Sequence, residues 1–173
     1  MRGSIRFAVP AALMLVAAGA GAVRADHQQV PMVKIQLEQE IAAPPAAIWA
    51  HMTSGKSLVT WCPVWKSEKN AAVNLARVGD VLDFTDEWGN GGRSVVTYLS
   101  KEKELRVAHE PNDGSYLCQA KLTLVPKGGT TIVRYLEQYT DESPAKEMEA
   151  TQAKTEGEMR QTLMALKKQV EKK

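Results

Sequence analysis

The last thirty residues constrain the fold of this chain most strongly, because they carry its longest helical repeat. Residues 144–173 contain one glycine and no proline after Pro144. Seven side chains in this segment recur at spacings of three and four, which places them on one stripe of a helix. They are Met148, Gln152, Thr155, Met159, Leu163, Leu166 and Val170. An amphipathic helix gains most of its stability from packing of that stripe, so the preceding residues have to supply a surface for it.

That surface is predicted to be a sheet. Apolar and polar side chains alternate in segments that are separated by glycine and proline turns. Two short helices, one beginning at Pro45 and one over residues 56–61, are expected after the first strand. We therefore predict an α+β fold, in which a curved antiparallel sheet of about seven strands and the long C-terminal helix enclose a cavity. The predicted strands cover residues 33–41, 64–68, 80–86, 93–100, 105–110, 115–126 and 130–140.

Four short motifs resemble those of the helix-grip superfamily, also called SRPBCC or START-like. Residues 41–50, IAAPPAAIWA, are similar to the family's strand exit followed by an Ala-Pro…Val-Trp helix. Trp61-Cys62-Pro63 resembles its Trp-x-Pro motif, and residues 78–84, VGDVLDF, resemble its Gly…Phe third strand. Residues 122–130, LTLVPKGGT, are similar to its Leu…Pro…Gly-Thr hairpin.

The resemblance covers about residues 33–170 and implies the Bet v 1/START-like helix-grip fold. The superfamily includes START-like lipid-binding domains, polyketide cyclase/dehydrase-like proteins and the domain shared with activators of the Hsp90 ATPase. It has no universal catalytic residue to carry over to this chain. Because binders, enzymes and adaptors share the fold, the resemblance alone does not select one function.

The first 25 residues are typical of a secretory signal peptide. Arg2 and Arg6 precede the apolar run of residues 7–23, and Val23-Arg24-Ala25 places small residues at the cleavage positions. The alternative is an uncleaved N-terminal anchor, although the run is short and rich in alanine and glycine for a membrane span. We expect cleavage after Ala25 and export to the periplasm or the cell exterior. Residues 26–32 would then be a flexible N-terminus and residues 33–173 the helix-grip domain.

Charge and motif content exclude several classes of partner. Removing residues 1–25 takes away Arg2, Arg6, Arg24 and no acid, so 22 basic residues become 19 against 20 acidic ones, and the net charge of +2 becomes −1. A near-neutral chain without a basic patch does not bind nucleic acid. The sequence has no cluster with metal-ligand spacing, so we expect no metal and no cofactor. Nothing in it supports membrane contact, and we expect a monomer.

Cys62 and Cys118 are the only cysteines. In an oxidising compartment two cysteines can form a disulfide, and both are predicted near the same end of the sheet. The alternative is two buried thiols that act as small apolar side chains. Four strand spacings of about 4.8 Å would separate them along the sheet, whereas a disulfide needs Cα atoms within about 7 Å. Both alternatives stay open.

The candidate site residues lie on the expected walls of the cavity. His109 shares a strand face with Leu105 and Val107, so it is either a general acid/base and ligand anchor or a hydrogen-bonded core histidine. Gln152 and Thr155 interrupt the apolar stripe of the long helix, which fits a partly polar cavity or an exposed sheet rim. We expect ligand contacts from Trp61, Phe84, His109, Tyr116, Gln152, Thr155 and Met159.

Three further charged residues are candidates for a polar cavity floor. Asp83, Arg134 and Glu137 lie within the predicted strands. Because Asp83 opposes Phe84 and Arg134 opposes Tyr135 in the alternation, we expect all three on the outer, solvated face.

Three functions fit these observations. The first is an exported, non-enzymatic binding protein for a small lipid-like or aromatic ligand, held between sheet and helix. The second is a cyclase/dehydratase-type enzyme that acts on a polyketide-like substrate, with His109 moving a proton. The third is a protein-interaction module like the Hsp90-activator domain, and the expected export counts against it.

Overall fold

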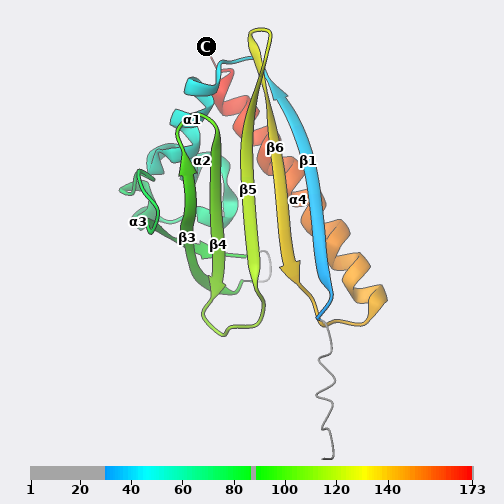
Figure 1. Ribbon diagram of the computed structural model, residues 1–173. Coiled ribbons are helices and arrows are strands. Elements are labelled where there is room, and N and C mark those ends of the chain that lie inside the picture. Colours follow the sequence, from blue (N-terminus) through cyan, green and yellow to red (C-terminus); the bar gives the residue numbers. More distant parts are fainter. Residues whose placement is uncertain (1–29, 87–88, 173) are drawn as a thin grey trace, which may run out of the picture.

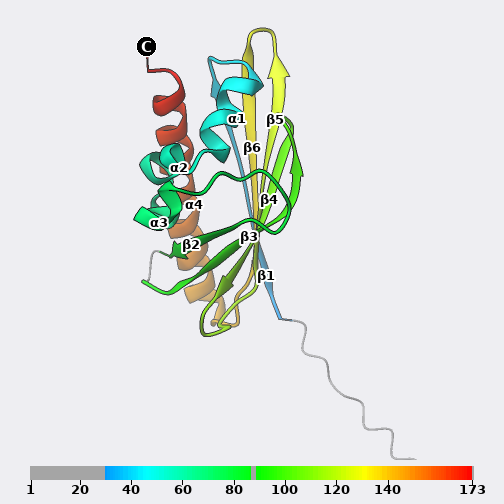
Figure 2. The same ribbon diagram turned by 90° about the vertical axis from the view of Figure 1, so that its left-hand side faces the viewer.

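The computed structural model describes residues 30–86 and 89–172. The predicted signal peptide, residues 1–25, lies outside the described residues, as do residues 26–29 of the expected flexible N-terminus. In the described part, one curved sheet forms the first layer and the helices form the second (Figures 1 and 2).

The sheet contains six antiparallel strands in the order β1-β6-β5-β4-β3-β2 (Figure 1). From β2 to β6 the chain forms a meander, and β1 joins at the far edge by pairing with β6 from Met32↔Thr140 to Ile41↔Thr131. Side chains alternate along β1 between buried and exposed, which confirms the period-2 pattern read there. The strands are β1 Met32–Ile41, β2 Val81–Thr85, β3 Gly91–Ser100, β4 Glu104–Pro111, β5 Cys118–Lys127 and β6 Thr130–Thr140.

One of the seven predicted strands, residues 64–68, is wrong. That stretch forms a 3-10 turn, η1 Pro63–Trp65, and runs into the short helix α3 Glu68–Ala71. Pro63 has no N–H to give to a strand neighbour, and the Trp65 indole turns inward to donate to Ser94 Oγ at 2.8 Å. Residues between β1 and β2 therefore belong to the helical layer, which holds four short elements instead of the expected two. The other two are α1 Pro45–Thr53 and α2 Gly55–Trp61.

Asn70 joins this helical layer to the sheet. Its side chain is 1% exposed, and its amide donates to the carbonyls of Trp65 at 2.8 Å and Asp83 at 2.6 Å. Its Oδ1 accepts the Asp83 N–H at 2.9 Å. These three bonds fix the end of η1 against the middle of β2.

The long helix, α4 Ala145–Val170, packs across the sheet beside β1 (Figure 2). Its C-terminal half packs tightly, with Leu163 and Leu166 nearly inaccessible. That end is fixed to the β1–α1 connection by Glu171, which accepts the Ala42 N–H at 2.7 Å and pairs with Lys167 at 2.9 Å. The middle of the helix, from Thr151 to Leu163, borders a cavity. Among the described residues, no helix is long and apolar enough to cross a membrane.

Candidate ligand cavity

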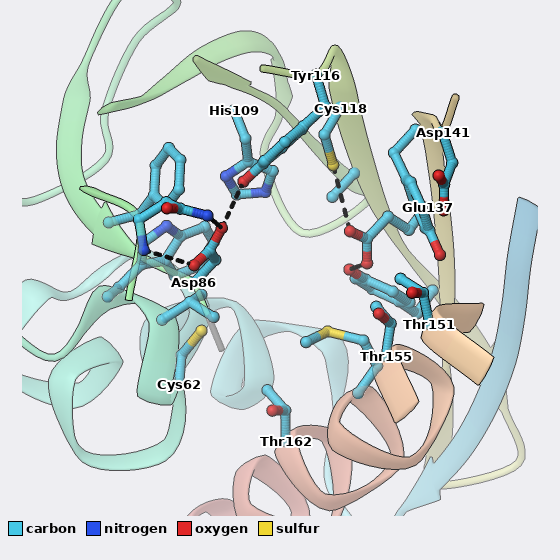
Figure 3. A pocket seen from close by; sticks show the side chains of 18 of the residues that line it. Cys62, Asp86, His109, Tyr116, Cys118, Glu137, Asp141, Thr151, Thr155 and Thr162 are labelled. Atoms are coloured by element: carbon cyan, nitrogen blue, oxygen red, sulfur yellow. Dashed lines mark hydrogen bonds between the residues drawn. The ribbon is translucent and has the colours of Figure 1, made fainter. Parts of the chain in front are cut away.

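A cavity of about 550 Å³ lies between the sheet and α4, which lines it from Thr151 to Leu163 (Figure 3). Its inner wall is largely apolar and aromatic, and it includes Trp61, Trp65, Phe84, Leu122 and Leu163. Its rim carries exposed polar residues from three loops, among them Asn90, Ser115 and Glu142. An apolar interior with a few polar groups and a polar rim is the usual form of a small-molecule site.

The structure brings most of the expected contact residues to this cavity. Its wall includes Trp61, Phe84, His109, Tyr116, Thr155 and Met159. Gln152 is not part of the wall, and Thr151 takes the place expected for it. Thr151, Thr155 and Thr162 follow one another at spacings of four and seven residues, so they share one face of the helix. Gln152 is one residue further along than Thr151, so its side chain points about 100° away from that face. Ligand contact at each of these residues stays a prediction.

His109 lies on β4 and reaches the cavity between two aromatic rings. Its ring centroid is 5.4 Å from that of Phe84, edge to face, and 6.2 Å from that of Trp65. Its Nδ1 is 2.7 Å from Ser94 Oγ, which accepts the Trp65 indole N–H. Burial lowers the pKa of the imidazole from 6.5 to about 4, so the ring is neutral at pH 7. His109 is thus a hydrogen-bonded strand histidine that also lines the cavity, and its role as an acid/base or ligand anchor stays a prediction.

The tautomer of the neutral His109 ring is coupled to the direction of its hydrogen bond with the Ser94 hydroxyl. The hydroxyl oxygen accepts the indole proton, since an indole N–H can only donate. When its own single proton is donated to Nδ1 of His109, the ring proton resides on Nε2. In that tautomer His109 offers a hydrogen-bond donor at Nε2 instead of a basic nitrogen.

Glu137 is the most deeply placed charged group of the cavity. Its side chain, on β6, is 9% exposed and lines the cavity wall (Figure 3). Oε1 accepts the Cys118 thiol at 3.2 Å, and Oε2 accepts the Tyr135 hydroxyl. Burial raises the pKa of the carboxyl, while the two hydrogen bonds lower it again in part. The two donors, one from β5 and one from β6, therefore partly offset the effect of burial on the charged form of Glu137.

The inward orientation of Glu137 corrects the sequence prediction, which placed it on the solvated face. Glu137 follows Tyr135 by two residues, so both share the inner face of β6. Asp83 and Arg134 do lie outward as expected, and Arg134 pairs with Glu38 at 2.7 Å. The missed signal was the run of inward positions Val133, Tyr135 and Tyr139 around the glutamate.

Both cysteines are buried free thiols, so the disulfide alternative is not what the structure contains. Cys62 ends α2 and Cys118 begins β5, and both line the cavity. Burial raises the pKa of Cys62 to about 12, which keeps it protonated and unreactive.

The α4 wall contains a hydroxyl with no partner. Thr162 is 7% exposed and lines the cavity, and within the described part of the chain its Oγ1 makes no hydrogen bond. A buried hydroxyl without a partner costs about 1–3 kcal/mol, a cost that a bound molecule with a polar group can remove.

At the rim, the Tyr116 hydroxyl donates to Asp86 at 3.3 Å. No group of three His, Cys, Asp or Glu side chains in residues 30–86 and 89–172 has the arrangement of a metal site.

One protein family matches the sequence over nearly all of the described chain. It is described as polyketide cyclase / dehydrase and lipid transport, and it matches residues 32–171. The chain belongs to this family. None of the curated proteins matches the sequence significantly.

Solved structures of similar fold are distant in sequence. A protein from Mesorhizobium loti shares 15% identity over 80% of this chain and 96% of its own, with a TM-score of 0.62. A protein from Chromobacterium violaceum shares 18% identity over 81% and 98%, with a TM-score of 0.59. Norcoclaurine synthase from Thalictrum flavum, in complex with dopamine and hydroxybenzaldehyde, shares 18% identity over 94% and 99%, with a TM-score of 0.61.

These likenesses establish the fold, and the family match places the chain in the helix-grip superfamily, as the sequence motifs indicated. The family match supports a ligand-binding or cyclase-type function.

Proposed function

We propose that this protein is an exported binding protein that holds a small apolar molecule between the sheet and α4. The observation that carries the proposal is the cavity of about 550 Å³ with its aromatic inner wall. Apolar pockets of this size suit molecules of drug-like dimensions, and burial of their surface drives binding. The hydroxyls of α4 and the Glu137–Tyr135–Cys118 group would orient the polar end of the ligand.

The neutral dye N-phenyl-1-naphthylamine tests the binding function. Its fluorescence should rise on addition of the protein and fall when a competing ligand enters the cavity. Ala120→Phe fills the cavity from the sheet side, since Ala120 lines it from β5 and is 4% exposed. Ala153→Phe adds the same ring on the exposed side of α4 and serves as the control. Equal dye binding by both folded variants would contradict a site between sheet and helix.

The exported location is tested separately. We propose that the mature chain begins at Asp26, as the cleavage pattern at Val23-Arg24-Ala25 indicates. N-terminal sequencing of protein from fractionated host cells should give Asp26 in the periplasmic or secreted fraction. Recovery of chain that still begins at Met1 in the cytoplasm would contradict export.

A cyclase-type enzyme is the second candidate, because His109 and Glu137 line the same cavity from different strands. A carboxylate that is partly desolvated can accept a proton from a carbon acid, while a neutral imidazole N–H can stabilise an enolate oxygen. Incubation with linear β-polyketone thioester mimics, followed by mass spectrometry, should give a cyclised product that both His109→Ala and Glu137→Gln reduce. An unchanged rate in both variants would leave the cavity with a binding role only.

A further inference from the structure

The charges on the cavity wall have one sign. Four carboxyl side chains contribute to the wall: Asp86, Glu137, Asp141 and Glu142. Among its described residues the wall contains no lysine and no arginine. His109 is neutral at pH 7, since burial lowers its pKa to about 4. An anionic ligand such as a fatty acid would meet only like charges in this cavity.

Glu137 is arranged as a carboxylate that has no cation beside it. Its two oxygens accept two donors, the Cys118 thiol and the Tyr135 hydroxyl, and each oxygen keeps a further lone pair. Glu137 takes part in none of the ion pairs found among the described residues. Burying a carboxylate without a counter-ion is costly, and a cation placed beside it removes much of that cost.

The α4 wall gives an independent indication that the cavity holds a polar ligand group. Thr162 is 7% exposed, and its Oγ1, which belongs to the cavity wall, has no partner within the described residues. A ligand hydroxyl or amine would satisfy it. The space between this wall and Glu137 is bordered by aromatic rings, including Trp61, Phe84 and Tyr135, and aromatic faces attract cations as well as apolar surface.

We propose that the ligand is a small aromatic or apolar amine, positively charged at neutral pH, whose ammonium group binds beside Glu137. The proposal rests on the binding function stated above and narrows its ligand to one charge class. The ammonium would donate to the carboxylate lone pairs that Cys118 and Tyr135 leave open, while the apolar body fills the space toward Trp61 and Phe84.

Three compounds of nearly equal shape test this choice: 2-(1-naphthyl)ethylamine, 2-(1-naphthyl)ethanol and 1-naphthylacetate. Each is titrated against the wild-type protein at pH 7 by displacement of N-phenyl-1-naphthylamine. We expect the amine to bind at least about tenfold more tightly than the alcohol, which corresponds to about 1.4 kcal/mol, and the carboxylate to bind most weakly. An alcohol or carboxylate that equals the amine overturns the proposal.

Two matched variants locate the effect. Glu137→Gln should bring the amine to within about threefold of the alcohol without weakening the alcohol. Glu149→Gln removes the same charge from an exposed position of α4 outside the cavity wall and should keep the full preference. An equal loss in both variants overturns a specific contact with Glu137. Should Glu137→Gln fail to fold, the wild-type ranking still decides the proposal.

Failure of the ligand class and failure of the binding function give different results. If the dye binds but the amine shows no advantage, the ligand class is wrong and the binding function stands. If neither the dye nor any of the three compounds binds, the cavity is not a ligand site and both proposals fall together.

Discussion

Acidification should destabilise the folded protein through His109. Burial between Trp65 and Phe84 lowers the pKa of the folded imidazole from 6.5 to about 4. Between these values the unfolded chain binds the proton and the folded protein does not, so unfolding becomes more favourable as the pH falls. The difference between 6.5 and about 4 corresponds to at most about 3.4 kcal/mol of unfolding free energy. Because one edge of the ring faces the cavity, we expect about 2 kcal/mol between pH 7 and pH 4.5.

Urea unfolding of the wild type and His109→Gln, followed by tryptophan fluorescence at pH 7, 6, 5 and 4.5, measures this contribution. Glutamine does not titrate but keeps a polar side chain next to Ser94. Glu137 acts in the opposite direction, since burial raises its pKa and the folded state then gains stability as the pH falls. That term is present in both proteins and cancels in their difference. The advantage of the wild type over the variant should shrink by about 2 kcal/mol on acidification. Parallel stability profiles would show that His109 titrates as in the unfolded chain and would refute the argument.

Four further measurements address single contacts. Thr162→Val should leave the unfolding free energy of the empty protein unchanged or raise it by about 1 kcal/mol, because no hydrogen bond is lost; a clear loss in urea unfolding would reveal a hidden partner. Asn70→Ala should cost about 3 kcal/mol in the same assay, since three buried bonds to the backbone disappear; a cost below about 1 kcal/mol would contradict its joining role. Gly55→Ala should also destabilise by about 2 kcal/mol or more, because a Cβ there would lie 2.1 Å from the carbonyl oxygens of Asn70 and Val73, and an unchanged midpoint would show that the backbone yields easily. Cys62, with its pKa raised to about 12, should resist iodoacetamide at pH 8 until urea is added, and rapid labelling of the native thiol would contradict its burial.

The sequence predicts the sheet well because its information there is local. Alternation along β1 and β6 identifies the inward positions, and glycine turns mark where the chain reverses. The spacing of Met159, Leu163 and Leu166 likewise identifies the packed stripe of α4. These patterns depend only on neighbouring residues, so no knowledge of the tertiary structure is needed to read them.

The errors arise where distant contacts decide the outcome. Residues 64–68 look like a short strand, but Pro63 and the bond from Trp65 to Ser94 turn them into the helical layer. Gln152 looks like an inward polar residue, yet the rotation of α4 over the sheet brings Thr151 to the wall instead. Neither outcome can be derived from the local sequence.

Glu137 is a different case, because its orientation could have been read from the alternation. Glu137 is in phase with the inward Val133, Tyr135 and Tyr139, whereas the general preference of charged residues for solvent predicts the opposite orientation. A charged residue that stays in phase with a buried face is a candidate for function for this very reason.

The pairing of β1 with β6 also determines the order in which the chain can fold. The hairpins from β2 to β6 connect strands that follow one another, so each can form as soon as its residues are available. Met32 of β1, in contrast, pairs with Thr140 of the last strand, so the edge of β1 has no sheet to join until nearly the whole domain has been synthesised. Folding of this protein should therefore be limited by the closure of that long loop, and the unpaired first strand is the segment most exposed to aggregation in the meantime.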